Sequence, residues 1–206
     1  MPVRYGVVTP NPQYGVETPV VKRLRADARR NRARLLAVAE DIFATRGLTV
    51  STEEIAAAAG VGIGTLFRHF PTKEALLEAV FVERLSALAD EANALALAPE
   101  PGEVFVAFIR DVLLQARSKS AIADALASAG VDLQHTAADV KAELNSALER
   151  LLSNAQRAGA VRDDISIAEL LAVLVGASRA VQHLGGNAEL EARTITIFLD
   201  GLRPPT

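Results

Sequence analysis

The chain has 206 residues, of which 50% are hydrophobic, and a formal net charge of −3. This apolar fraction is enough for a sizeable core, and the absence of cysteine excludes disulfides, thiolate nucleophiles and cysteine-ligated metals. The charge is unevenly divided, because residues 1–73 carry 11 Lys and Arg against 6 Asp and Glu, whereas residues 74–206 carry 11 against 19. A front part of net charge +5 favours contact with a polyanion, although chance clustering near a terminus explains the charge alone equally well.

The first residues carry no regular pattern. Residues 1–21 contain four prolines and two glycines, which indicates a flexible tail and not a secretory signal, so we expect a cytoplasmic protein. A basic segment, Lys22–Arg34, follows, and we expect residues 1–27 to form a flexible basic extension. Two interpretations of the basic segment stay open: an arm that enters a minor groove of DNA, or a solvated run of charge at a helix end.

Three helices are predicted in the front part, over about residues 28–46, 52–59 and 63–69. The first has apolar residues at the spacing of one helix face and ends before Gly47. The second begins with the S-x-x-E pattern of a capping box at Ser51.

The corner between the second and third helices has the residue types that a helix-turn-helix needs. A small residue, Ala56, lets the two helices approach, and Gly60 can adopt the positive φ of a tight corner. A shared core would come from Ile55, Val61 and Leu66. Gly62 and Gly64, which follow the corner, each cost up to about 1 kcal/mol of helix stability relative to alanine. Close approach of the backbone to a ligand therefore explains these two glycines better than stability does. An ordinary helical corner with spare glycines is the alternative.

The stretch TEEIAAAAGVGIGTLFRHFPTKEALL, residues 52–77, resembles the DNA-binding signature of the TetR-type transcriptional repressors. The resemblance runs from the first predicted helix to the start of the fourth, and beyond residue 80 only the length and the helical layout agree. It implies a helix-turn-helix DNA-binding domain over residues 28–73 and a helical effector-binding and dimerisation domain over residues 74–206.

The resemblance also implies which residues contact DNA. It places Ile63, Gly64 and Thr65 against base edges with Phe67 and Arg68 nearby, and it places Thr52, His69 and Lys73 on phosphates. Independently of the resemblance, the free amides at a helix start suit an anion beside Thr52 and beside Lys73. The family often has serine at Gly62 and tyrosine at Phe67, so two hydroxyls are missing here, although Phe67 can still touch a thymine methyl.

The remaining residues predict six further helices and no β-hairpin, so the fold class is all-α with about nine helices in total. The six cover about residues 72–97, 102–117, 121–129, 136–158, 166–184 and 190–202. The helix over 166–184 is apolar nearly all round, which favours a four-helix dimer interface made with the last helix and a symmetry mate, as the resemblance also implies. Burial within one subunit is the alternative.

The resemblance further implies a small-molecule pocket in the body. The residues that could line it are Phe81, Phe105, Phe108, Gln115, Asn145 and Gln182. For each of these residues, an ordinary core or surface position is the competing interpretation.

The expected function is that of a sequence-specific DNA-binding transcriptional regulator, a repressor that a small-molecule effector releases from a palindromic operator by shifting conformational populations. The competing hypothesis is a helical scaffold or partner-binding protein without regulatory DNA binding. An enzyme is disfavoured, because the three histidines are isolated and no metalloprotease, nucleophile-elbow or Walker motif is present. We therefore expect no catalytic residues, no metal site and no cofactor, and we expect a homodimer that does not contact membranes.

Overall fold

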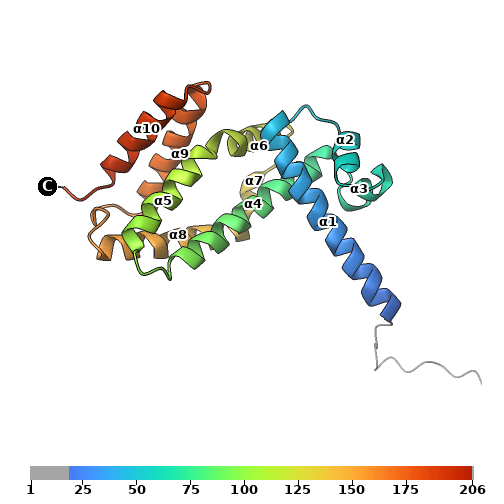
Figure 1. The fold of residues 1–206 in the computed structure, drawn as a ribbon, viewed down its shortest axis with the longest axis horizontal. Helices are drawn as coiled ribbons and strands as arrows, with labels where there is room; N and C mark the ends of the chain where they lie inside the picture. Colours follow the sequence, from blue (N-terminus) through green and yellow to red (C-terminus); the bar gives the residue numbers. More distant parts are fainter. Residues whose placement is uncertain (1–18, 206) are drawn as a thin grey trace, which may run out of the picture.

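The computed structural model describes residues 19–205, without the side chains of residues 19–26, 116–120 and 134. The described residues form ten helices and no strand (Figure 1). The helices are α1 (Pro19–Arg46), α2 (Thr52–Ala58), α3 (Ile63–His69), α4 (Lys73–Leu95), α5 (Pro101–Leu114), α6 (Ala116–Ser128), α7 (Leu133–Thr136), α8 (Ala138–Arg157), α9 (Ile167–His183) and α10 (Ala188–Gly201). The predicted all-α class is confirmed, and nine of these helices correspond to predicted ones.

Helix α1 is longer than the sequence pattern predicted. It begins at Pro19 and not at about residue 28, because the intervening Lys, Arg, Leu and Ala residues are good helix formers and proline is tolerated in a first turn. The part of the predicted flexible extension from Pro19 to Asp27 is therefore helical, and its residues 1–18 lie outside the described residues. In Figure 1 the first half of α1 extends away from the other helices.

Helix α8 corresponds to the helix predicted over residues 136–158, whereas the short helix α7 just before it was not predicted. The break between the two helices follows from local hydrogen bonds, because Asp132 Oδ1 accepts the amide of His135 (3.3 Å) and starts a separate turn. Lys141 Nζ of α8 donates to the carbonyl of Leu133 (3.0 Å) and ties the two helices together. A helix of four residues is too short to show an apolar period, so the sequence pattern did not predict α7.

The described helices bury two apolar cores. The head core is formed by α1, α2, α3 and the first turns of α4, and the body core by the rest of α4 with α5, α8, α9 and α10. We call these two parts the head and the body. Helix α4 belongs to both and packs along α8, while α9 and α10 lie at the end opposite α2 and α3 (Figure 1). An ion pair between Arg84 of α4 and Glu40 of α1 (3.0 Å) adds a polar contact between α4 and the head.

Helix α6 belongs to the body in sequence but packs into the head. Ile122 and Leu126, one helical turn apart, are buried in the head core. From the same helix Asp124 receives two hydrogen bonds from the Arg179 guanidinium of α9, each 2.8 Å long. Helix α6 therefore contacts the head through its apolar face and α9 through Asp124.

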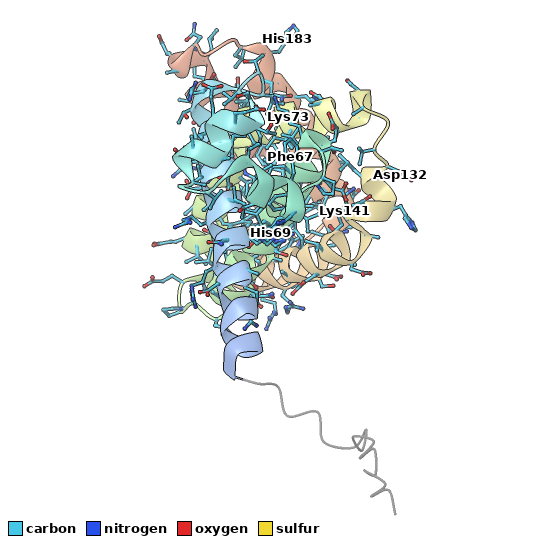
Figure 2. All side chains as sticks on the ribbon, turned by 90° about the vertical axis from the view of Figure 1, so that its right-hand side faces the viewer. Phe67, His69, Lys73, Asp132, Lys141 and His183 are labelled. Atoms are coloured by element: carbon cyan, nitrogen blue, oxygen red, sulfur yellow. The ribbon has the colours of Figure 1, made fainter. Side chains whose placement is uncertain are left out.

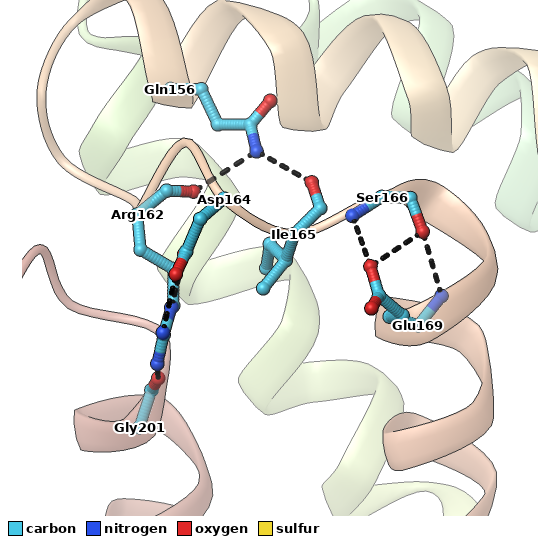
Figure 3. A network of polar contacts seen from close by, with 7 residues as sticks. All are labelled: Gln156, Arg162, Asp164, Ile165, Ser166, Glu169 and Gly201. Atoms are coloured by element: carbon cyan, nitrogen blue, oxygen red, sulfur yellow. Dashed lines mark hydrogen bonds and ion pairs between the residues drawn. The ribbon is translucent and has the colours of Figure 1, made fainter.

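The connection between α8 and α9 is fixed by side chains that bond to its backbone (Figure 3). Gln156 Nε2 donates to the carbonyls of Arg162 and Ile165, both at 3.0 Å. The Arg162 amide donates to the carbonyl of Leu202 (2.9 Å), and its guanidinium makes two bonds of 2.6 and 2.7 Å to Asp164. The start of α9 and the end of α10 are thereby held together.

Helices α9 and α10 both start with a side-chain cap. Ser166 and Glu169 form a complete capping box, in which the Ser166 amide donates to Glu169 Oε2 (2.8 Å) and the Glu169 amide donates to Ser166 Oγ (3.3 Å). The hydrogen bond from the Ser166 amide lowers the pKa of Glu169. Asn187 caps α10 by accepting the Leu190 amide at 3.2 Å. The apolar helix α9 therefore has a sharply defined beginning.

Candidate DNA interface

The corner between α2 and α3 is built on one glycine. Gly60 has φ +65°, and its amide donates to the carbonyl of Ala57 (3.0 Å) while the next amide, of Val61, donates to Ala56 (3.0 Å). This pair of bonds is the Schellman arrangement that ends a helix on a left-handed residue. Leu66 of α3, which is fully buried, packs into the head core behind the corner. The predicted helix-turn-helix corner is confirmed.

The start of α2 is tied to the end of α1. Ser51 Oγ accepts the Glu54 amide (3.2 Å) and Glu54 Oε2 accepts the Ser51 amide (3.1 Å), so the predicted capping box is confirmed. The other oxygen of Glu54 lies 2.6 Å from Nη2 of Arg46, the last residue of α1. The bond from Arg46 and then the Ser51 amide lower the pKa of Glu54.

Two of the residues predicted to hold phosphates have partners inside the head. Thr52 is largely buried, and its hydroxyl donates to Glu53 Oε2 at 3.3 Å. The Lys73 ammonium donates to the carbonyl of Leu48 and thereby joins the first turn of α4 to the loop between α1 and α2. Thr72 caps α4 by accepting the Ala75 amide (3.1 Å). Lys73 therefore braces the helix-turn-helix.

The outward face of α3 is apolar with one cation. Ile63, Gly64, Phe67 and Arg68 are exposed, whereas Thr65 is half-buried. Figure 2 looks onto this end of the molecule, where Phe67 lies between Lys73 and His69 in the view. A helix fixed by a buried leucine on one side and exposed on the other is the geometry of an element that inserts into a groove.

The end of α3 is braced by α1 through a contact that the sequence did not reveal. The Arg32 guanidinium lies 5.2 Å from the centre of the Phe70 ring, within the range of a cation–π contact. Phe70 is buried, and the half-buried His69 ring lies 6.2 Å from it. The sequence showed Arg32 only as part of the basic segment, because its partner Phe70 is 38 positions away in the chain.

Comparison with known proteins agrees with this geometry. A family model for bacterial regulatory proteins of the tetR family matches residues 35–80, which contain the helix-turn-helix. A second model, for the C-terminal domain of SbtR-like transcriptional regulators, matches residues 100–204, more than half of the chain. The chain belongs to the TetR family of transcriptional regulators.

Solved TetR structures share the whole fold. A TetR regulator from Mycobacterium vanbaalenii is 43% identical, with a TM-score of 0.71 over 87% of this chain and 99% of its own. A TetR regulator from Streptomyces coelicolor is 35% identical, with a TM-score of 0.69 over 85% of this chain and 99% of its own. Among curated proteins, the Escherichia coli K12 regulator UidR is 25% identical over 89% of this chain and 95% of its own length. TetR-family members are DNA-binding repressors with ligand-binding C-terminal domains and are not enzymes, so the scaffold hypothesis is not favoured.

The six residues predicted for the TetR effector pocket do not lie together. Phe105 and Phe108 are buried in the body core, while Phe81 packs against the head core. Gln115 and Asn145 are exposed. The sixth residue, Gln182, is half-buried and accepts a bond from Arg179 at 3.3 Å.

A hollow of about 580 Å³ lies instead at the start of α5. Its wall is mainly apolar and includes Pro101, Val106 and Ala158, with Arg110 at one side. None of the six predicted residues lines it. The sequence pointed to aromatic residues, but the aromatic side chains of α5 fill the core.

The described residues contain neither a membrane-spanning helix nor a cluster of metal ligands. No helix among residues 19–205 is long and apolar enough to cross a membrane. Within the same part of the chain, no group of three or more His, Cys, Asp and Glu side chains is placed to hold a metal ion.

Proposed function

We propose that α3 enters the major groove of a palindromic operator and that two chains, paired through α9 and α10, deliver two such helices to it. The observation that carries the first part is the rigid presentation of α3, which the Gly60 corner and the buried Leu66 fix from behind. One recognition helix covers only a few base pairs, so useful specificity calls for two copies. DNA binding also supports a cytoplasmic location, where the chromosome lies.

Within this proposal the base-reading residues are Ile63, Gly64, Thr65, Phe67 and Arg68. All except the half-buried Thr65 are exposed on α3. The phosphate contacts are His69 together with Thr52 and Lys73. For Thr52 and Lys73 the amides at the helix starts make the contact, because the two side chains already have partners within the head.

The dimer is supported by apolar side chains that a single chain leaves in water. Val173 and Val175 of α9 are 56% and 63% exposed, and Leu190 and Ile197 of α10 are 47% and 69% exposed. The two α10 residues are seven positions apart and therefore share a face. Burial of each such side chain contributes up to about 1.5–3 kcal/mol, which a two-fold four-helix contact would supply.

The two cores support a division into two domains, although α4 and α6 of the second domain also contribute to the head core. We propose that residues 28–73 bind DNA, with residues 1–27 as a basic extension, and that residues 74–206 bind the effector and dimerise. Because α6 contributes Ile122 and Leu126 to the head core, an effector bound in the body has a physical route to the head. The dimer then releases the operator when the effector binds more tightly to the conformation whose two heads are at a separation that fits DNA poorly.

Selection from a random duplex pool tests the DNA proposal. We expect an inverted repeat, with binding that weakens steeply as salt rises. Arg68→Ala should weaken binding with little change in thermal stability, since Arg68 is exposed. A chain that binds no duplex in dilute buffer would refute the proposal and revive the scaffold hypothesis.

Sedimentation tests the dimer with a matched pair of variants. Ile197→Glu places a charge on the proposed interface, whereas Leu97→Glu places the same charge on a side chain that is 88% exposed in the loop after α4. We expect only Ile197→Glu to produce monomers at micromolar concentration. If the two variants had the same oligomeric state, the dimer interface would not include this face of α10.

A further inference from the structure

We propose that the recognition helix identifies its half-site mainly through the C5 methyl groups of thymines, which Ile63 and Phe67 contact in the major groove. This inference rests on the proposed function and adds the kind of half-site that α3 reads. It begins from two large apolar side chains on a seven-residue helix, which are 37% and 41% exposed. Side chains four positions apart lie on the same face of a helix.

The opposite side of α3 explains why these two side chains are not needed by the fold. Leu66 alone is fully buried from this helix, and it fills the head core together with residues of the other helices. Phe70, just after the helix, is buried under the Arg32 guanidinium. Ile63 and Phe67 therefore remain as an exposed apolar pair on the element that meets DNA.

The spacing of the pair matches neighbouring base pairs. Side chains at i and i+4 are about 5–6 Å apart, and successive bases of a strand are 3.4 Å apart along the duplex axis. Ile63 and Phe67 thus reach bases separated by about one or two steps. In the major groove the thymine methyl is the apolar group that base edges present, so it is the natural partner of both side chains.

The face has few groups for reading bases by hydrogen bonds. Gly62 and Gly64 carry no side chain, and an added Cβ at either would meet no atom within 4 Å, so packing does not require glycine there. Thr65 is half-buried, which leaves Arg68 as the exposed side-chain donor of α3. Because Gly62 and Gly64 have no side chains, the backbone of α3 can come close to the bases. Thymine methyl groups then lie within reach of α3.

The charge of the head favours duplex DNA as the partner of the exposed pair Ile63 and Phe67. Arg68 stands beside the apolar pair, and Arg29 and Arg34 of α1 are exposed on the same domain. An apolar patch with basic surroundings suits a polyanion that carries methyl groups. A protein partner for the same patch is an outcome of the test below.

The experiment removes one methyl group at a time from the selected operator. Each thymine of a half-site is replaced by deoxyuridine, which lacks only the C5 methyl and keeps every hydrogen bond of the base. We expect at least two positions in each half-site, one or two steps apart, at which the Kd rises about fourfold, as the burial of one methyl-sized group implies. The remaining thymines serve as internal controls.

The side chains are assigned by repeating the series with variants. In Phe67→Ala one of the sensitive positions should lose its response to deoxyuridine, and in Ile63→Ala the other should lose it. Phe67→Tyr keeps the ring and should keep the response. Circular dichroism on the same samples checks that each variant is folded.

The possible failures are distinguishable from failure of the proposed function. Wild-type binding to the selected repeat, with its salt dependence, establishes operator recognition independently of the methyl groups. Given that binding, the inference is overturned if every deoxyuridine operator binds as tightly as the thymine operator. It is also overturned if Phe67→Ala leaves operator affinity unchanged, which would assign the apolar patch to a protein partner.

Discussion

Replacement of Gly60 by alanine should destabilise the head through the backbone alone. The residue has φ +65°, and an added Cβ would meet no atom within 4 Å, so no clash contributes. An L-residue in the left-handed region costs about 1–2 kcal/mol, and the lower entropy of the unfolded alanine chain offsets about 0.4–1 kcal/mol of that cost. The net expectation is a loss of about 1 kcal/mol.

Gly64 provides the control for this substitution. An added Cβ there also meets no atom within 4 Å, but the residue lies within α3 and does not have a positive φ. Alanine is the better helix former, so Gly64→Ala should stabilise the fold by up to about 1 kcal/mol. The same chemical change, four positions apart, should therefore have opposite signs.

Urea unfolding followed by circular dichroism measures both effects as shifts of the midpoint at constant slope. Operator affinity separates the two glycines further. Gly64→Ala should weaken binding although it stabilises the fold, because the added methyl group lies on the face that approaches the bases. Gly60→Asn should recover part of the loss, since asparagine tolerates the left-handed region.

Equal losses at Gly60 and Gly64 would refute the reasoning, because they would mean that φ does not decide the cost. An unchanged midpoint for Gly60→Ala would mean that the corner is not left-handed in solution. Either result would remove the physical basis for the rigid presentation of α3.

Further predictions concern the caps and the contacts of α6. Ser51→Ala should cost about 1 kcal/mol, measured by urea unfolding, because the α2 amides lose their cap. The pKa of Glu54 is lowered in the fold, so its contribution is complete above its unfolded pKa and is lost as the pH falls through the folded one; the difference in Tm between wild type and Glu54→Gln should shrink in acid. Leu126→Ala should cost about 2–5 kcal/mol by the same unfolding assay, because the side chain is fully buried. Arg179→Glu should change Tm little, since the pair is exposed, but should alter operator affinity in a binding titration, and adding Asp124→Arg should restore it.

The helix-turn-helix was predictable because its signals are local. Ser51 and Glu54 are three positions apart, and the corner needs a glycine at one position, Gly60, so neighbouring residues carry the whole pattern. The structure confirms both features. The start of α1 was less predictable, because its first turns lack an apolar stripe and depend only on the helix propensity of basic residues.

Contacts between distant segments were beyond the sequence. Ile122 and Leu126 lie in the helix predicted over residues 121–129, and no pattern indicated that they complete the head core. The hydrogen bond from the Lys73 ammonium to the carbonyl of Leu48 could not be predicted, because the two residues are 25 positions apart. The hollow at α5 was missed for the same reason, since its walls come from the start of α5 and the end of α8.

The two faces of α6 constrain how an effector could act. Ile122 and Leu126 are buried, so α6 cannot leave the head core without exposing apolar surface, which costs about 1.5–3 kcal/mol for each side chain. The bonds between Asp124 and Arg179 are exposed and cost at most about 1 kcal/mol to break. The weaker contact yields first, so α6 should move together with the head and slide against α9. If α9 is fixed in the dimer, that sliding changes the separation of the two heads. An operator binds tightly only when this separation matches the spacing of its two half-sites.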